Sequence, residues 1–206
     1  YKNARGLFGG AAQTLIVPSA RAIEIQERLG ARGVLLALAA TAHHAIAGGS
    51  PPDLIIGHGV LGRLIARITV GMGAPPPTVW ETNDARRAGS FGYPVVHPDA
   101  DERKDYRTII DASGAGSQLD TFVGRLAKGG EIVLAGFYEE RLSFAFVPTF
   151  MREARFRVAA EWQPADLQAT QALMRIGRLS LDELITHEEM PEDAEEAYAT
   201  AFTDSS

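Results

Sequence analysis

Short apolar runs with the character of buried strands alternate along this chain with segments of helical spacing. The expected strands are residues 53–56, 78–81, 94–96, 108–111, 131–136 and 156–160. The expected helices are residues 31–47, 60–73, 117–127, 165–176 and 191–202, and Gly129-Gly130 is expected to end the third of these. Strands that are apolar throughout and alternate with helices form a parallel sheet with both faces covered. The sequence therefore predicts an α/β protein with a doubly wound, six-stranded parallel sheet.

A glycine turn follows the first expected strand and opens the helix after it. Its sequence, GHGVLG at residues 57–62, fits the pattern G-x-G-x-x-G. Gly57 permits the tight turn, Gly59 lets a pyrophosphate approach the backbone, and Gly62 lets the helix pack closely on the sheet. The helix N-terminus then offers free N–H groups to the phosphates. This context predicts a Rossmann dinucleotide-binding domain, with Gly57, Gly59, Val60, Leu61 and Gly62 at the cofactor.

An acidic residue ends the second expected strand. Glu81 lies 19 residues after Gly62, and a carboxylate there can accept hydrogen bonds from both ribose hydroxyls of the adenosine. It would also repel the 2′-phosphate of NADP, so the charge favours NAD as cofactor. Arg86 and Arg87 lie nearby, and an arginine can hold a 2′-phosphate, so NADP stays open. Asn83 or Asp84 is expected to cap the helix that follows.

Composition excludes several classes of protein. The net charge of −6 argues against nucleic acid as a partner, because phosphate backbones need clustered Lys and Arg. The absence of Cys excludes disulfides and thiolate zinc sites within these residues. No apolar run approaches the roughly 20 residues that span a bilayer, so we expect no membrane span and a cytoplasmic protein. The chain opens at Tyr1 rather than Met, and we expect a fragment.

The order of segments resembles the medium-chain dehydrogenase/reductase superfamily. The segments that carry this likeness are DASG at 111–114, KGGEIVLAG at 128–136, GRL at 177–179 and LITH at 184–187. A narrower resemblance is to the bacteriochlorophyllide a dehydrogenase family of photosynthetic bacteria. It rests on residues 36–48, 57–63, 135–146, 150–155 and 160–164.

The resemblance implies an NAD-dependent alcohol dehydrogenase. Its reaction would oxidise the 3-(1-hydroxyethyl) group of a bacteriochlorophyllide precursor, a tetrapyrrole, to 3-acetyl. It implies three regions: residues 1–32 as the closing part of a GroES-like substrate domain, 33–163 as the Rossmann domain, and 164–206 as a return segment that packs on the substrate domain. Members of the superfamily often pair through the edge of the cofactor domain's sheet, so the oligomeric state stays open and a homodimer is one alternative.

The resemblance assigns further residues to the cofactor. Ser113 and Gly114 should border the adenosine side or the bridging ribose, and Arg86 remains a second contact near the ribose. Ala135, Gly136 and Phe137, at the end of the fifth strand, should border the nicotinamide. The catalytic acid or base is not identified, because it would lie in the part of the substrate domain that is not seen.

Three residues on the first expected helix are candidates for proton transfer. By the resemblance Thr41 lies beside the nicotinamide, and either His43 or His44 could relay a proton. The favoured alternative places one histidine in the core and the other at a domain seam, since adjacent helical residues do not share a face. No third ligand accompanies them, so no metal site is expected. His58, in the glycine turn, could touch phosphate but is expected to be partly solvated.

Aromatic residues between Phe137 and Phe150 could wall a flat pigment, and Arg152 and Arg155 could pair with a propionate. Ordinary core, a subunit interface and a solvated charged face explain these residues equally well. Two other functions stay open: a zinc-free quinone reductase of the same superfamily that prefers NADPH, and a non-catalytic module that senses NAD. Glu81 argues against the first of these.

Overall fold

The computed structural model describes residues 14, 16–19, 22–89 and 91–203. The chain forms two compact units, residues 1–33 and residues 34–206. Much of the region expected to close a substrate domain, including residues 1–13, 15, 20 and 21, lies outside the described residues. The 3₁₀ helix η2 (Glu27–Leu35) runs across the division between the units. The strands and the functional candidates all belong to the second unit.

Six parallel strands form one sheet, as the sequence predicted, and their order is β3-β2-β1-β4-β5-β6. The strands are β1 (Leu54–Ile56), β2 (Thr78–Trp80), β3 (Val95–Val96), β4 (Tyr106–Asp111), β5 (Leu126–Leu134) and β6 (Arg155–Val158). The chain winds outward from β1 in one direction and then outward from β4 in the other. The β1–β4 pair is thus the switch point of a Rossmann sheet, where the carboxyl ends of the strands leave a crevice for a ligand.

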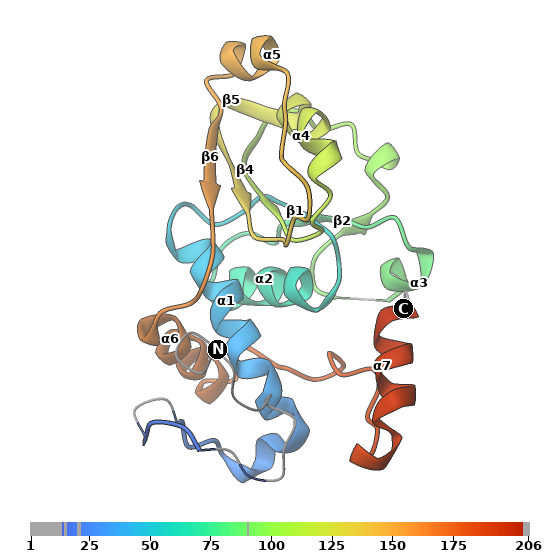
Figure 1. Ribbon diagram of the computed structural model, residues 1–206. Coiled ribbons are helices and arrows are strands. Elements are labelled where there is room, and N and C mark those ends of the chain that lie inside the picture. The colour runs from blue at the N-terminus through green and yellow to red at the C-terminus, as the bar shows by residue number, and fades with distance from the viewer. Residues whose placement is uncertain (1–13, 15, 20–21, 90, 204–206) are drawn as a thin grey trace. The chain divides into compact units, whose positions relative to one another are not determined.

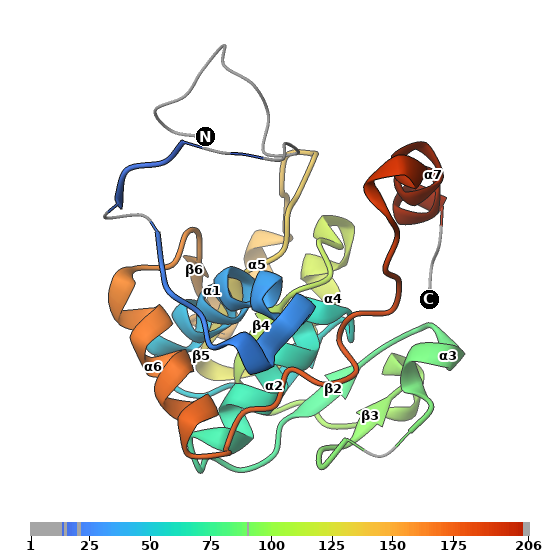
Figure 2. The same cartoon turned by 90° about the horizontal axis from the view of Figure 1, so that it is seen from below.

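Helices cover both faces of this sheet (Figure 1). One face is covered by α1 (Leu36–Ala47) and α2 (Val60–Gly71), with α6 (Pro164–Arg175) packed against α1, and Figure 2 shows these helices from below. The other face carries α4 (Leu119–Arg125). The remaining helices are α3 (Asp84–Arg87), α5 (Phe146–Met151), α7 (Ala194–Thr203) and the 3₁₀ turns η3 (Pro98–Ala100), η4 (Gly116–Gln118) and η5 (Pro191–Asp193).

Rows of apolar side chains across the strands build the core. Leu54 pairs with Ile109, Ile109 with Ile132, and Ile132 with Phe156, so one row crosses β1, β4, β5 and β6. Phe122 of α4 belongs to the same buried cluster. Because neighbouring residues of a strand point to opposite faces, the intervening apolar residues face the helices on the other side. Burial on both faces explains why β1 and the last three residues of β5 are apolar, whereas the edge strand β6 alternates arginines with apolar residues.

The expectation that Gly129-Gly130 ends a helix is wrong. Helix α4 ends at Arg125, and β5 begins at Leu126 and runs through both glycines. The pairing of β4 with β5 jumps from Tyr106–Leu126 to Thr108–Glu131, so four residues of β5 bulge out of the ladder. Gly129 has φ +73 in this bulge, a conformation that favours glycine. A glycine with positive φ is typical both of a helix end and of a strand bulge, so Gly129 alone does not distinguish the two.

One stretch of the described chain, Glu27–Ala47, is long and apolar enough to cross a membrane by length and composition alone. This stretch includes Glu27, Arg28 and Arg32, so it is not an uninterrupted apolar run. Within the second unit, however, α1 is a core helix. Its residues Leu36, Ala39, Ala40, Ala42, Ala45 and Ile46 are buried, and it packs on α2 and α6. A buried core helix passes the same test of length and composition.

Candidate functional site: a cavity at the switch point of the sheet

A cavity of about 480 Å³ opens at the carboxyl ends of β1, β2 and β4. Five residues that the sequence assigned to a cofactor line it together: Gly57, Gly59, Glu81, Arg86 and Ser113. They come from the turn after β1, the end of β2, α3 and the turn after β4. The cavity is completed by Trp80, Thr82, His97, Pro98, Asp99, Gln118, Thr121 and Phe122, among others.

Two glycines of the turn, Gly57 and Gly62, have no room for a side chain. Gly57 has φ +93, and its N–H donates to the carbonyl oxygen of Trp80 at 2.8 Å. A Cβ atom on Gly62 would lie 1.9 Å from the carbonyl oxygen of Gly57. Gly59 caps α2 in an extended conformation, without a side-chain cap. The first N–H groups of α2 are therefore offered to a ligand at the turn, as a phosphate requires.

The Glu81 carboxylate is held by backbone N–H groups. One oxygen accepts hydrogen bonds from Thr82 at 2.8 Å and Asn83 at 2.9 Å, and the other accepts one from His58 at 2.9 Å. Burial alone would raise the pKa of Glu81. The three N–H donors and the charge of Arg86 outweigh burial and lower its pKa. The residue is thus an oriented, ionised carboxylate at the wall of the cavity at neutral pH.

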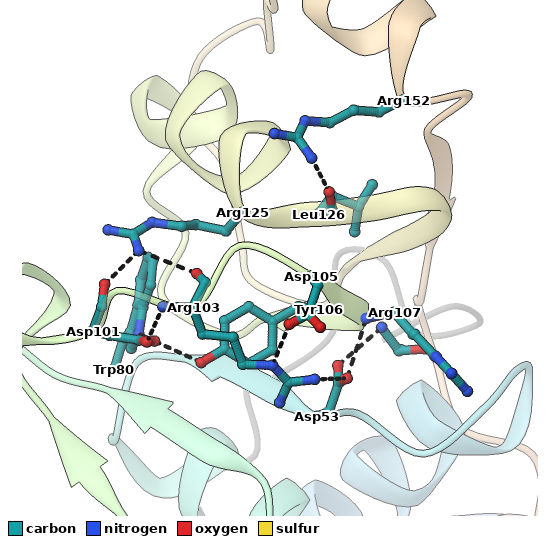
Figure 3. Close-up of polar contacts among 11 residues, drawn as sticks. Asp53, Trp80, Asp101, Arg103, Asp105, Tyr106, Arg107, Arg125, Leu126 and Arg152 are labelled. Carbon is teal, nitrogen blue, oxygen red and sulfur yellow. Dashed lines mark hydrogen bonds and ion pairs between the residues drawn. The ribbon is translucent and has the colours of Figure 1, made fainter.

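A cluster of hydrogen bonds around Asp101 holds Trp80, which lines the cavity (Figure 3). One oxygen of Asp101 accepts bonds from the indole of Trp80 and the phenol of Tyr106, both at 2.6 Å. Arg125 donates to the carbonyl oxygens of Asp101 and Arg103, and its guanidinium lies over the Trp80 ring. Since Trp80 and η3 both line the cavity, this cluster helps to set its shape.

The turns after β4 and β5 interlock. Asp111, at the end of β4, is fully buried and accepts bonds from the Ser113 hydroxyl at 2.6 Å and the Tyr138 phenol at 2.6 Å. Its carbonyl oxygen also accepts the N–H groups that follow β5. A Cβ on Gly114 would lie 2.5 Å from the carbonyl oxygen of Phe137, and one on Gly136 would lie 2.5 Å from the Gly114 nitrogen. Both glycines therefore allow a close backbone approach.

The other assigned residues lie outside the lining of this cavity. Val60, Leu61 and Gly62 form the first turn of α2, behind the lining glycines. Ala135 and Gly136 follow β5, and the Phe137 side chain is 90% exposed. Their placement at the nicotinamide stays a prediction.

The histidines of α1 contact a single carboxylate on α6. The Nδ1 atoms of His43 and His44 lie 2.8 Å and 2.9 Å from the two oxygens of Asp166. Both imidazoles therefore meet one carboxylate, although adjacent helical residues were expected to have different surroundings. Asp166 lies beside α1, so two adjacent side chains reach it from either side. The Thr41 hydroxyl donates to the carbonyl oxygen of Ala37.

Asp166 is an ionised, buried partner for this pair. Burial alone would raise its pKa, but the Gln163 N–H and the two histidines lower it overall. Within the described residues, no group of three or more His, Asp or Glu side chains could hold a metal ion.

The expectation that His58 is partly solvated is wrong. Its side chain is fully buried, with Nδ1 2.7 Å from the Arg86 carbonyl oxygen and Nε2 3.0 Å from the Tyr93 hydroxyl. These partners lie 28 and 35 residues away along the chain. No local pattern could reveal them, nor could one reveal the pairing of Asp111 with Tyr138 across 27 residues.

Comparison with known proteins gives two close matches. The chain is 59% identical over 202 residues to the 2-desacetyl-2-hydroxyethyl bacteriochlorophyllide A dehydrogenase of Rhodobacter capsulatus, and 58% identical to that of Cereibacter sphaeroides. Each alignment covers 97% of this chain. The chain is a homologue of these two dehydrogenases. It spans 64% of the length of each. No protein-family model matches.

Solved structures share the fold at low identity. A short chain alcohol dehydrogenase from E. coli CFT073, complexed with NADH, has a TM-score of 0.80 at 20% identity and covers 92% of this chain and 61% of its own. Acetophenone reductase from Geotrichum candidum, in complex with NAD, has a TM-score of 0.77 at 22% identity and covers 89% of this chain and 56% of its own. A putative zinc-binding dehydrogenase from Sinorhizobium meliloti, bound to NADP, has a TM-score of 0.78 at 19% identity. The match covers 92% of this chain and 61% of the dehydrogenase. These likenesses establish the Rossmann fold of this chain.

Proposed function

We propose that this chain carries the cofactor-binding part of an NAD-dependent dehydrogenase of the medium-chain superfamily. Its substrate is a bacteriochlorophyllide with a hydroxyethyl group, which it oxidises to acetyl. The observation that carries the proposal is the match of nearly the whole chain to two dehydrogenases named for that substrate. The cavity at the switch point supports the cofactor half, because its glycine turn and carboxylate suit a dinucleotide.

The chain's own residues would hold the cofactor in a fixed direction. The turn at Gly57 and Gly59, with the N–H groups of Val60, Leu61 and Gly62, would hold the pyrophosphate. Glu81 would accept bonds from the adenosine ribose, and Ser113 and Gly114 would border it. Ala135, Gly136 and Phe137 would place the nicotinamide. A nicotinamide held there would supply the hydride acceptor for the carbinol carbon of the alcohol, and the hydroxyl proton would leave to a base.

The charge of the cavity supports NAD rather than NADP. Glu81 is ionised and oriented by three N–H donors, so a 2′-phosphate beside it would be repelled. The path of the hydroxyl proton is a separate proposal. Thr41, His43 and His44 remain its candidates, and Asp166 would orient the two imidazoles.

Two further proposals concern the whole protein. We expect a cytoplasmic enzyme, where the NAD pool is available. We also expect a homodimer, because apolar side chains on α5 and at the sheet edge are exposed. They include Phe146, Val147, Phe150, Met151 and Val158.

The decisive experiment mixes the intact protein with NAD and a bacteriochlorophyllide that carries the hydroxyethyl group. Pigment absorption and NADH formation are followed together. NADH that forms in step with a shifted pigment band supports the proposal. Dinucleotide binding with no oxidation under these conditions would contradict the dehydrogenase activity and favour a nucleotide-sensing module. Turnover with NADPH and a quinone instead would favour a quinone reductase.

A further inference from the structure

His58 uses every polar group it has within the protein. Its N–H donates to Glu81, and its carbonyl oxygen accepts from Nε of Arg63 at 3.2 Å. Its ring bonds the carbonyl oxygen of Arg86 and the hydroxyl of Tyr93. A variable position of the glycine turn is thereby joined to three segments that lie far from it in sequence.

The partners determine the state of the ring. The Arg86 carbonyl oxygen can only accept, so Nδ1 carries a hydrogen, and Nε2 then accepts the hydrogen of the Tyr93 hydroxyl. Burial lowers the pKa of His58, and the charge of Arg63 lowers it further. The ring is therefore neutral at pH 7, as this pair of bonds requires.

Aromatic packing seals the ring from solvent. The Phe91 ring meets His58 edge-on at 4.6 Å between centroids and stacks on Tyr93 at 5.9 Å. The guanidinium of Arg63 lies over Phe91, 5.5 Å from its centroid. Because water cannot compete for the buried ring, its hydrogen bond to the Arg86 carbonyl oxygen holds the backbone of α3 beside the glycine turn.

Arg86 and Glu81 both line the cavity, and the charge of Arg86 lowers the pKa of Glu81. A guanidinium nitrogen of Arg86 lies 4.0 Å from the position that a Cβ of Gly59 would occupy, which is the side where the turn receives a pyrophosphate. Glu81 is bonded to the His58 N–H and faces the ribose side. If α3 were released from the ring, Arg86 could move toward the ribose and offset the charge of Glu81.

We propose that His58 is a positioning residue for cofactor selectivity: its ring keeps Arg86 at the pyrophosphate side, so that Glu81 alone meets the adenosine ribose. The proposal rests on the dinucleotide site of the proposed function. The His58 side chain would influence selectivity although it contacts neither the ribose nor a phosphate. Selectivity then depends on a buried ring as well as on the exposed charges of the cavity.

The test measures the dissociation constants of NAD and NADP by titration calorimetry on the intact protein. His58→Leu removes both ring bonds, whereas His58→Asn keeps a donor near the position of Nδ1. Since lost buried hydrogen bonds cost about a factor of ten in affinity, we expect His58→Leu to lower the preference for NAD about tenfold. His58→Asn should keep most of that preference. Tyr93→Phe should lower it about threefold, and the exposed Tyr198→Phe should leave it unchanged.

The outcomes separate the inference from the proposed function. If His58→Leu weakens both cofactors equally, the residue is only structural and the proposal is overturned. If His58→Leu does not fold, Tyr93→Phe decides, and an unchanged ratio of the two constants overturns the proposal. A wild-type protein that binds neither cofactor refutes the dinucleotide site itself, and with it this inference.

Discussion

At Gly62, an added Cβ atom would lie closer to the Gly57 carbonyl oxygen than any non-bonded contact allows. The neighbour is backbone, so neither atom can rotate away. We expect Gly62→Ala to destabilise the protein by at least about 1–3 kcal/mol, as for overpacked positions, and to abolish NAD binding. Urea denaturation and calorimetry measure the two effects. Gly124→Ala is the control, since Gly124 lies in α4 with nothing within 4 Å of its Cβ position.

The effect of the Glu81 charge on cofactor preference can be tested with a substitution that keeps the size of the side chain. Glu81→Gln keeps the side-chain length but removes the negative charge that faces the ribose. We expect the ratio of NADP to NAD dissociation constants to fall about tenfold, because repulsion of the 2′-phosphate is lost. Glu102→Gln, at an exposed carboxylate, should leave the ratio unchanged. An unaltered ratio in Glu81→Gln would show that this carboxylate serves only the turn.

Sequence reasoning reached some residues of the cavity and not others, for a physical reason. Gly57, Gly59 and Glu81 belong to one strand–turn–helix–strand pattern with a fixed spacing. The sequence of that segment therefore predicts that they line the same cavity. His58 and Tyr138 take their roles from partners brought close only by the folded sheet. Sequence reasoning therefore brings together residues that line one cavity, but it misses the residues that support them.

Among the elements, the strands were the most predictable. The central strands β1 and β4 contain buried apolar runs, which indicate a strand whatever its pairing register. The bulge in β5 was not predictable, because Gly129 suits a helix end and a strand irregularity equally well. The short helix α5 was also missed. It begins within an aromatic run that carries no periodicity.

The contact between α1 and α6 is expected to contribute to the stability of the fold. Asp166 holds His43 and His44 and caps its own helix, so Asp166→Asn should cost about 1–3 kcal/mol at pH 7. Its pKa in the folded protein is lowered, so its stabilisation is present above the unfolded value of about 3.9 and is lost as pH falls through the folded pKa. Urea denaturation at pH 7 and pH 3 measures both effects.

The expected outcome is a smaller loss of stability in acid for Asp166→Asn than for the wild type. Glu140→Gln, which removes an exposed carboxylate, should behave as the wild type does. Equal stability of Asp166→Asn and wild type at pH 7 would mean that this contact contributes nothing to the fold.

For the whole molecule, the exposed apolar side chains of α5 predict association. Phe150 is 65% exposed beside the edge strand β6, and Phe202, on α7, is 86% exposed. If the proposed homodimer uses the sheet edge, Phe150→Glu should dissociate it and Phe202→Glu should not. Sedimentation velocity of the intact protein measures this. A wild-type monomer at micromolar concentration would contradict the dimer.

The 206 residues themselves also carry a prediction. The cavity lies within the second unit, so a polypeptide of these residues should bind NAD, as calorimetry can show. The homologous dehydrogenases are longer, and this chain spans 64% of them. We therefore expect no oxidation of the hydroxyethyl pigment by these residues alone. Turnover by this polypeptide would place the whole catalytic apparatus within it.

The interlocked turns after β4 and β5 bear on how such a domain could be redesigned. Gly114 occupies the space that a Cβ of Gly136 would need, and the Phe137 carbonyl occupies the space that a Cβ of Gly114 would need. Tyr138 reaches back to Asp111. A graft that imports only one turn from another dehydrogenase would bring a side chain into its neighbour's backbone. Cofactor engineering on this scaffold must therefore exchange residues 111–116 and 135–138 as a single cassette, although 18 residues lie between them in the sequence.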